Sequence, residues 1–324
     1  MFRRTNIGNW FIACLVAVCS LVVITPSAFA KPLNAVVTVG MVADIVREVG
    51  GAAVTVTTLM GSGVDPHSYR QTRSDVSKLA RADIIFANGL HLEAQLDPLL
   101  HQLQSRQRVV FVADLISRND LIEAEGFSGR YDPHVWMDPR LWQQAVTIIR
   151  DALSDAAPEK ADVFATNATV YTSLLKALDN ALRVTIETVP EDERVLVTAH
   201  DAFSYFGRAF DVDVIGVQGL STDSEAGLNR IEALVATLVD RKIKAVFVES
   251  SVSEQNIKAL IEGAAARGHS VSVGGTLFSD AMGEEGTFEG TYRGMIDHNA
   301  TTITRALGGK APDRGVTGQL SPSS

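Results

Sequence analysis

The sequence predicts an α/β fold of two lobes, each with a mostly parallel sheet flanked by helices, joined by one long linker helix. Three observations predict it. Short strand-like runs alternate with helical stretches in the first half of the chain, the same alternation returns in the second half, and a long segment without internal Gly or Pro separates the two. Strands that alternate with helices form parallel sheets, because the crossover helices cover both faces.

The first α/β lobe is expected over residues 31–156. Four short apolar runs in it look like buried strands, and two longer segments between them look like helices. The strands are predicted at 35–39, 54–59, 84–87 and 109–112, and the helices at 74–82 and 92–103.

The linker helix is expected within residues 157–189. Residues 158–188 carry apolar side chains at helical spacing, from Val163 and Val170 to Ile186. A single helix of this length would span about 45 Å, enough to join two lobes as a stiff rod, and Pro190 would end it. Two helices with a kink remain the alternative, because alanines and threonines blur the apolar stripe.

The second α/β lobe is expected over residues 190–308. It repeats the pattern of the first lobe, with strands predicted at 195–198, 212–215, 245–248 and 271–273, and helices at 225–238 and 253–267. The tail at 309–324 is rich in Gly, Pro and Ser, so disorder is expected there.

The first thirty residues are typical of an export signal. Arg3 and Arg4 precede an apolar run that ends in small residues before Ala30, so cleavage after Ala30 and a soluble periplasmic protein are expected. A retained anchor or a lipoprotein signal is the alternative, because the residues before Cys14 faintly resemble an acylation site. Cys14 falls early in the apolar run, which favours the cleaved form.

Composition limits the chemistry of the mature chain. Both cysteines, Cys14 and Cys19, lie in the signal, so any metal site must use nitrogen and oxygen ligands. Loss of Arg3 and Arg4 leaves 27 basic against 38 acidic residues, a formal net charge of −11. This charge argues against nucleic acid and anionic surfaces as partners and is compatible with a cationic ligand, although simple solubility explains most such charges.

Three of the seven histidines stand in settings that suit metal ligands. His67 and His134 each follow an Asp-Pro dipeptide, which stiffens the backbone that presents them, and His200 follows the strand predicted at 195–198. In open α/β sheets, ligands bind outside the carboxyl ends of strands, where residues distant in sequence converge. A site in the cleft between the lobes is therefore expected, although any one of these histidines, taken singly, is more often a hydrogen-bonded structural residue than a ligand.

Seven motifs spread over the chain form a specific combination. They are Val64-Asp-Pro-His-Ser-Tyr69, Asn88-Gly-Leu-His-Leu-Glu93, Asp132-Pro-His-Val-Trp-Met-Asp-Pro139, Thr198-Ala-His-Asp-Ala-Phe-Ser-Tyr-Phe206, Gly216-Val-Gln-Gly-Leu-Ser-Thr222, Phe247-Val-Glu-Ser250 and Leu277-Phe-Ser-Asp280. With them, the sequence from about residue 37 to residue 307 resembles the metal-receptor solute-binding proteins of zinc and manganese ABC importers.

The resemblance implies a metal between two lobes, held by His67, His134, His200 and Asp280. Asp280 follows from the resemblance alone. It further implies Mn²⁺ or Zn²⁺ bound as transported cargo, an inner-membrane ABC permease with its ATPase as partner, and no enzymatic activity. We also expect a monomer.

The choice between the two metals rests on opposing features. Family members with a histidine at the position of His200 include the zinc receptors, whereas some manganese receptors have a glutamate there. The chain lacks the long His- and acid-rich insertion of dedicated zinc receptors, and residues 275–292 resemble the manganese-transporting branch. Manganese is therefore expected as the physiological cargo, with zinc binding at least as tightly in vitro.

The remaining polar residues receive structural roles. His91 is expected at a helix start, and the other three histidines on the surface or hydrogen-bonded. Glu249 could orient a ligand histidine by accepting its second N–H, or could be a plain strand-end residue. The aspartates beside the ligands are interpreted as helix caps and turn residues. The three other histidines are His101, His269 and His298, and the aspartates beside the ligands are Asp65, Asp132, Asp138 and Asp201.

Two other functions compete with a metal receptor. A metallohydrolase could use three histidines and a carboxylate, but the sequence has no His-Glu-x-x-His run and no nucleophile elbow. A receptor for an organic metal chelate would need a larger site lined by aromatic residues or arginines. A surface adhesin role could accompany any of these.

Overall fold

The structure is a computed structural model that describes residues 31–124 and 129–322. The expected signal, residues 1–30, lies outside the described residues. Within those described ranges, none of the helices has the length and apolar character that a membrane span requires.

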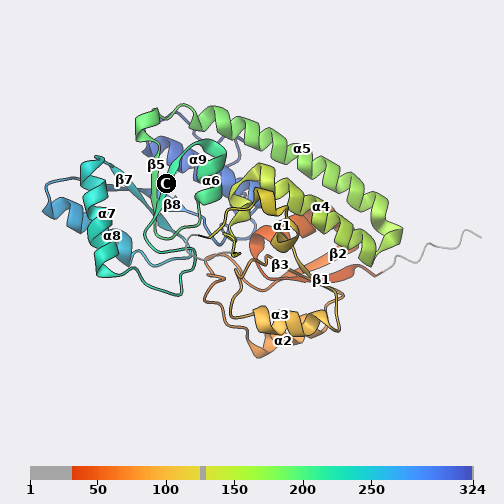
Figure 1. Ribbon diagram of the computed structural model, residues 1–324. Coiled ribbons are helices and arrows are strands. Elements are labelled where there is room, and N and C mark those ends of the chain that lie inside the picture. Colours follow the sequence, from red (N-terminus) through yellow and green to blue (C-terminus); the bar gives the residue numbers. More distant parts are fainter. Residues whose placement is uncertain (1–30, 125–128, 323–324) are drawn as a thin grey trace, which may run out of the picture. The chain divides into compact units, whose positions relative to one another are not determined.

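The N-terminal half holds a four-stranded sheet in which all neighbours are parallel, in the order β2-β1-β3-β4. The helices α1 and α4 lie on one side of this sheet, and α2 and α3 lie on the other (Figure 1). All four strands were predicted, with ends that differ by at most two residues. The elements are β1 (Leu33–Val37), α1 (Gly40–Gly50), β2 (Val54–Thr58), α2 (Arg73–Ala80), β3 (Ile84–Ala87), α3 (Asp97–Gln104), β4 (Val109–Phe111) and α4 (Pro139–Ala156).

A single unbroken helix, α5 (Ala161–Ile186), follows α4. Its 26 residues span about 39 Å, and it packs against α1 and α4 of the N-terminal half and against α9 of the C-terminal half. Tyr171 on α5 donates a hydrogen bond of 2.5 Å to the buried carboxylate of Asp44 on α1. The prediction of one helix is confirmed, but Val163 and Val170 of the predicted apolar stripe are exposed.

The C-terminal half contains two parallel strand pairs, β5-β6 and β7-β8, and β5 lies beside β7. A separate apolar core, with Val197 and Val246 from the strands and Val235 and Leu260 from the helices, joins β5 and β7 to α7 and α8. The elements are β5 (Val195–Thr198), α6 (Ser204–Phe210), β6 (Asp213–Gly216), α7 (Leu228–Asp240), β7 (Ala245–Glu249), α8 (Gln255–Ala266), β8 (Ser272–Leu277) and α9 (Tyr292–Ala306).

The tail differs from the expected disorder. Over 309–322 it packs against α9 and the loop before it, because two carboxylates bind its backbone. Asp297 accepts hydrogen bonds from Val316 N at 2.8 Å and Thr317 N at 3.0 Å, and Glu289 accepts one from Ser321 N at 2.6 Å. Composition missed this order because the tail contributes backbone N–H donors, which every residue except proline has, and the acceptors come from elsewhere in the fold.

Candidate metal centre

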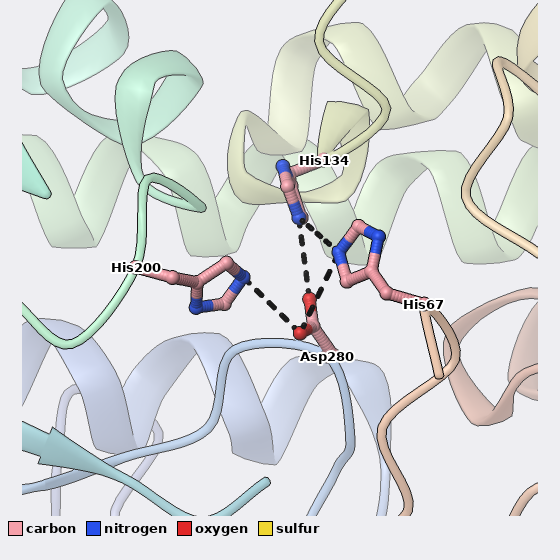
Figure 2. A group of neighbouring side chains, drawn as sticks. All are labelled: His67, His134, His200 and Asp280. Carbon is pink, nitrogen blue, oxygen red and sulfur yellow. Dashed lines mark hydrogen bonds and ion pairs between the residues drawn. The ribbon is translucent and has the colours of Figure 1, made fainter. Parts of the chain in front are cut away.

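The four predicted ligands come from four separate loops. His67 lies between β2 and α2, and His134 immediately precedes a short 3₁₀ turn before α4. His200 follows β5, and Asp280 follows β8, so three of the four loops leave the carboxyl ends of strands. Figure 2 shows the four side chains pointing toward one another, and each is at most 2% exposed.

The donor atoms gather around one point. One nitrogen or oxygen from each residue lies within 4.8 Å of the others. His134 Nε2 lies 3.3 Å from His67 Nε2 and 3.3 Å from Asp280 Oδ1, and His200 Nε2 lies 3.1 Å from Asp280 Oδ2. Four atoms at about 2.1 Å from one ion in a tetrahedron are about 3.4 Å apart, so the cluster has the size of a metal shell.

The donor set also fits a metal chemically. Asp280 Oδ1, Asp280 Oδ2 and His200 Nε2 are buried without a hydrogen-bond partner among the described residues. Buried polar atoms of this kind are costly unless something satisfies them. Imidazole nitrogen suits zinc, and carboxylate oxygen suits manganese, so the mixed shell admits both ions.

Carboxylates fix two of the rings. His134 Nδ1 lies 2.7 Å from Asp132 Oδ1, and His200 Nδ1 lies 2.6 Å from Glu249 Oε2. Because an ionised carboxylate only accepts, each Nδ1 carries the proton and each Nε2 is left to bind a metal. The contact considered for Glu249 is present, and Asp132 makes the same contact with its histidine, which its interpretation as a turn residue missed.

The backbone of every candidate histidine is held by a carboxylate as well. Asp65 accepts from His67 N, Asp132 accepts from His134 N, and Glu249 accepts from His200 N, each at 2.9 Å. Asp65 and Asp132 therefore do form the predicted turns.

The other two aspartates beside the predicted ligands were interpreted as capping or turn residues. Asp138 confirms the capping role, because it accepts from Arg140 N at 2.8 Å at the start of α4. Asp201 accepts from the hydroxyl of Ser204 at 2.7 Å.

Burial and neighbouring charges shift the pKa values in different directions. Burial lowers the pKa of His67 to about 4. Burial also opposes the charged form of His134, but Asp132 and Asp280 raise its pKa to about 9. At His200, Glu249 and Asp280 likewise outweigh burial and raise the pKa well above its usual range. Against burial, His200 and His134 hold the pKa of Asp280 well below its usual range.

The other four histidines lie outside this cluster. His91 lies six residues before α3 and not at its start, as was expected, but its Nδ1 pairs with Asp97 in the first turn of that helix at 3.0 Å. His101 packs on the ring of Phe111. His269 and His298 each contact a backbone carbonyl, at 2.6 and 2.9 Å.

Reasoning from the sequence settings of single residues found three of the four candidate ligands, namely the histidines. Asp280 was found only by resemblance, although its place just after a predicted strand at 271–273 is a weak signal that sequence reasoning could have used. The contact between Glu249 and His200 could be anticipated because both residues end neighbouring strands, β7 and β5.

Parallel strands with loops that converge on a buried cluster of three histidines and a carboxylate define an α/β protein with a metal-sized site. Residues 35–306 match the model of the family described as zinc-uptake complex component A, periplasmic, and the chain belongs to this family.

Individual relatives agree with this assignment. The chain is 49% identical over 277 residues to the manganese-binding lipoprotein MntA of Bacillus subtilis (strain 168), covering 86% of this chain and 90% of the relative. It is 43% identical over 281 residues to the zinc-binding protein TroA of Treponema pallidum (strain Nichols), covering 87% and 90%. The solved structure of the periplasmic zinc-binding protein TroA from Treponema pallidum matches with a TM-score of 0.83 at 42% identity, over 86% of this chain and 99% of that chain.

Proposed function

We propose that this protein is the receptor of an ABC importer and binds one divalent transition metal ion through His67, His134, His200 and Asp280. The observation that carries the proposal is the convergence of four buried side chains from four loops, two of which, His200 and Asp280, carry atoms without a hydrogen-bond partner among the described residues. The metal is cargo, to be handed to an inner-membrane permease that works with an ATPase. Residues 31–156 and 190–308 are the lobes that enclose it, and 157–189 joins them.

Zinc titration by calorimetry, with metal analysis of the loaded protein, tests this assignment. The parent should bind one ion per chain, and His67→Ala should bind it at least about tenfold more weakly, the scale on which even residues behind the ligands act. His101→Ala is the matched control, because that side chain is exposed on α3. Unchanged affinity in His67→Ala would reject the ligand set.

The proposed cargo in the cell is manganese, with zinc as the tighter ligand in vitro. The relative named as manganese-binding is 49% identical, and the one named as zinc-binding is 43% identical, so both ions are represented among related proteins. Metal analysis of protein isolated from its native periplasm, without added metal, distinguishes them. Zinc alone in that sample would overturn the choice.

His200 offers a sharper probe of the cargo. Exchanging its nitrogen for a carboxylate oxygen should lower the preference for zinc over manganese. Because Glu249 lies 2.6 Å from His200 Nδ1, we would combine His200→Glu with Glu249→Gln to avoid two facing carboxylates. An unchanged ratio of zinc to manganese affinity, measured against Glu249→Gln alone, would remove His200 from the shell.

A binding role rather than catalysis is supported by Asp280. Both of its oxygens face the cluster, at 3.3 Å from His134 Nε2 and 3.1 Å from His200 Nε2, so the four residues can offer five donor atoms to one ion. A catalytic metal keeps a position open for water. The small span of the donors likewise leaves little room for an organic chelate. Ester or phosphoester hydrolysis by the zinc-loaded protein, lost in His134→Ala, would restore the hydrolase alternative.

Export to the periplasm completes the proposal, with cleavage after Ala30. The relative MntA is named a lipoprotein, so acylation at Cys14 or Cys19 is the competing form. Intact mass of the exported protein separates them. A chain that begins at Lys31 supports the cleaved form, and a lipid-modified cysteine overturns it.

A further inference from the structure

Hydrogen bonds join the two halves of the chain beside the metal centre. Tyr205 Oη donates to the carbonyl of Asp132 at 2.9 Å, and Trp136 Nε1 donates to the carbonyl of Ser279 at 3.0 Å. Thr222 Oγ1 donates to Asp65 Oδ2 at 2.6 Å. The first two hold the His134 loop against the C-terminal half, and the third holds the His67 loop.

The contact at His67 is the more accessible one. Tyr205, Trp136 and Asp132 are at most 1% exposed, whereas Thr222 and Asp65 are half-buried. A hydrogen bond that water can reach is replaced more easily than a buried one. Opening of the site is therefore easier on the side of His67.

Asp65 connects this contact to the metal shell. Its Oδ1 accepts from His67 N at 2.9 Å, and its Oδ2 accepts from Ser68 Oγ at 2.8 Å as well as from Thr222. The carboxylate thus fixes the backbone from which the His67 ring extends. The hydroxyl of Thr222 bonds to Asp65, and Asp65 bonds to His67, so Thr222 is linked to His67 through Asp65.

The segment that carries Thr222 is a loop anchored at its base. It runs over residues 219–227 between β6 and α7, and the buried Gln218 donates to Ser224 O at 3.3 Å and to Glu225 Oε2 at 3.2 Å. Gly219 and Gly227 bound it, and an added Cβ at either would meet nothing within 4 Å. The glycines leave open space at both ends of the loop, and Gln218 holds its second half.

From this geometry we propose that Thr222 is a positioning residue that holds His67 through Asp65 and thereby sets the rate at which the metal leaves. The inference rests on the proposed function, because it takes His67 as a ligand. Loss of the Thr222 hydroxyl frees Asp65 and lets His67 withdraw first.

The test compares zinc release from the parent, Thr222→Val and Thr222→Ser. Val keeps the shape and removes the hydroxyl donor, whereas Ser keeps the donor. Release is followed as the rise in absorbance when a colorimetric zinc chelator captures the ion. Thr222→Val should release zinc about tenfold faster, the factor expected for one hydrogen bond to a charged group, and Thr222→Ser should stay close to the parent.

Two further measurements separate the possible failures. Ser221→Ala changes the exposed neighbour and should release zinc at the parent's rate, and the melting temperature of metal-free Thr222→Val should lie within a few degrees of the metal-free parent's. Equal release rates for parent and Thr222→Val, or fast release from Thr222→Ser too, would overturn the role of Thr222. A larger loss in the metal-free melting temperature would make that role merely structural. A parent that binds no zinc would instead reject the proposed function itself.

Discussion

The loops of His67 and His134 begin with the same Asp-Pro-His tripeptide but are held differently. Asp132 bonds both the backbone N–H and the ring Nδ1 of His134, whereas Asp65 bonds the backbone N–H of His67. Among the described residues, no carboxylate lies on His67 Nδ1. The tripeptide thus fixes the backbone position of each histidine, and the surrounding fold decides how its ring is held.

The two rings also differ in charge. The pKa of His67 is lowered to about 4 and that of His134 is raised to about 9. Near neutral pH the metal-free protein therefore holds His67 neutral and His134 protonated. The neutral His67 can bind a metal directly, whereas His134 must first release a proton.

The largest expected effect comes from removing the more firmly held ring. His134→Ala should lower the unfolding free energy of the metal-free protein by about 3 kcal/mol, because the buried Asp132 carboxylate loses its charged partner. His67→Ala should lower it by less, since Asp65 keeps its other donors. Urea unfolding of both variants without metal measures the difference, and equal losses would break the comparison.

Acid should weaken metal binding. A proton on His134 competes with the metal at any pH below about 9, so affinity falls as pH decreases, by at least about tenfold per pH unit. His200 adds a second proton with the same sign, because its pKa is also raised. Zinc competition titrations at pH 8, 7 and 6 measure the slope, and calorimetry in buffers of different ionisation enthalpy counts the released protons. Affinity that is constant over this range would contradict the charge assignment.

The carboxylates of Asp132 and Glu249 should affect zinc affinity, because each holds the ring of a candidate ligand histidine. Asp132→Asn and Glu249→Gln should each weaken zinc binding by about ten- to a hundredfold, because an amide no longer dictates which ring nitrogen carries the proton. Zinc affinity and metal-free melting temperature are measured together. A loss in melting temperature without a loss in affinity would assign both carboxylates to the fold alone.

The smallest effect is expected at Asp65. Asp65→Asn keeps an oxygen that can accept from His67 N, so affinity should fall by less than about tenfold, through the weaker bond of a neutral acceptor. The difference in zinc affinity between Asp65→Asn and Asp132→Asn tests most directly whether the His67 and His134 loops are held differently. If Asp65→Asn weakens binding as much as Asp132→Asn, the two loops are held alike.

Much of the fold could be predicted because it rests on local patterns. The apolar runs at β3 and β5 are long enough to show a strand and too short for a helix, and their predicted bounds match the structure. Helix α5 was predicted from its spacing and the proline after it. The exposed Val163 and Val170 show the limit of this method, because an apolar residue on a helix does not reveal whether a neighbour covers it.

The sequence by itself determined how the three histidines are presented locally, since Asp-Pro-His and the strand before His200 are local features. Only the tertiary structure decided which groups complete the site. Asp280 and His67 are joined by no local pattern, and the link from Thr222 to Asp65 spans 157 residues. The physical reason is that coordination and hydrogen bonding depend on distances of about 3 Å between atoms, and packing of whole elements sets those distances.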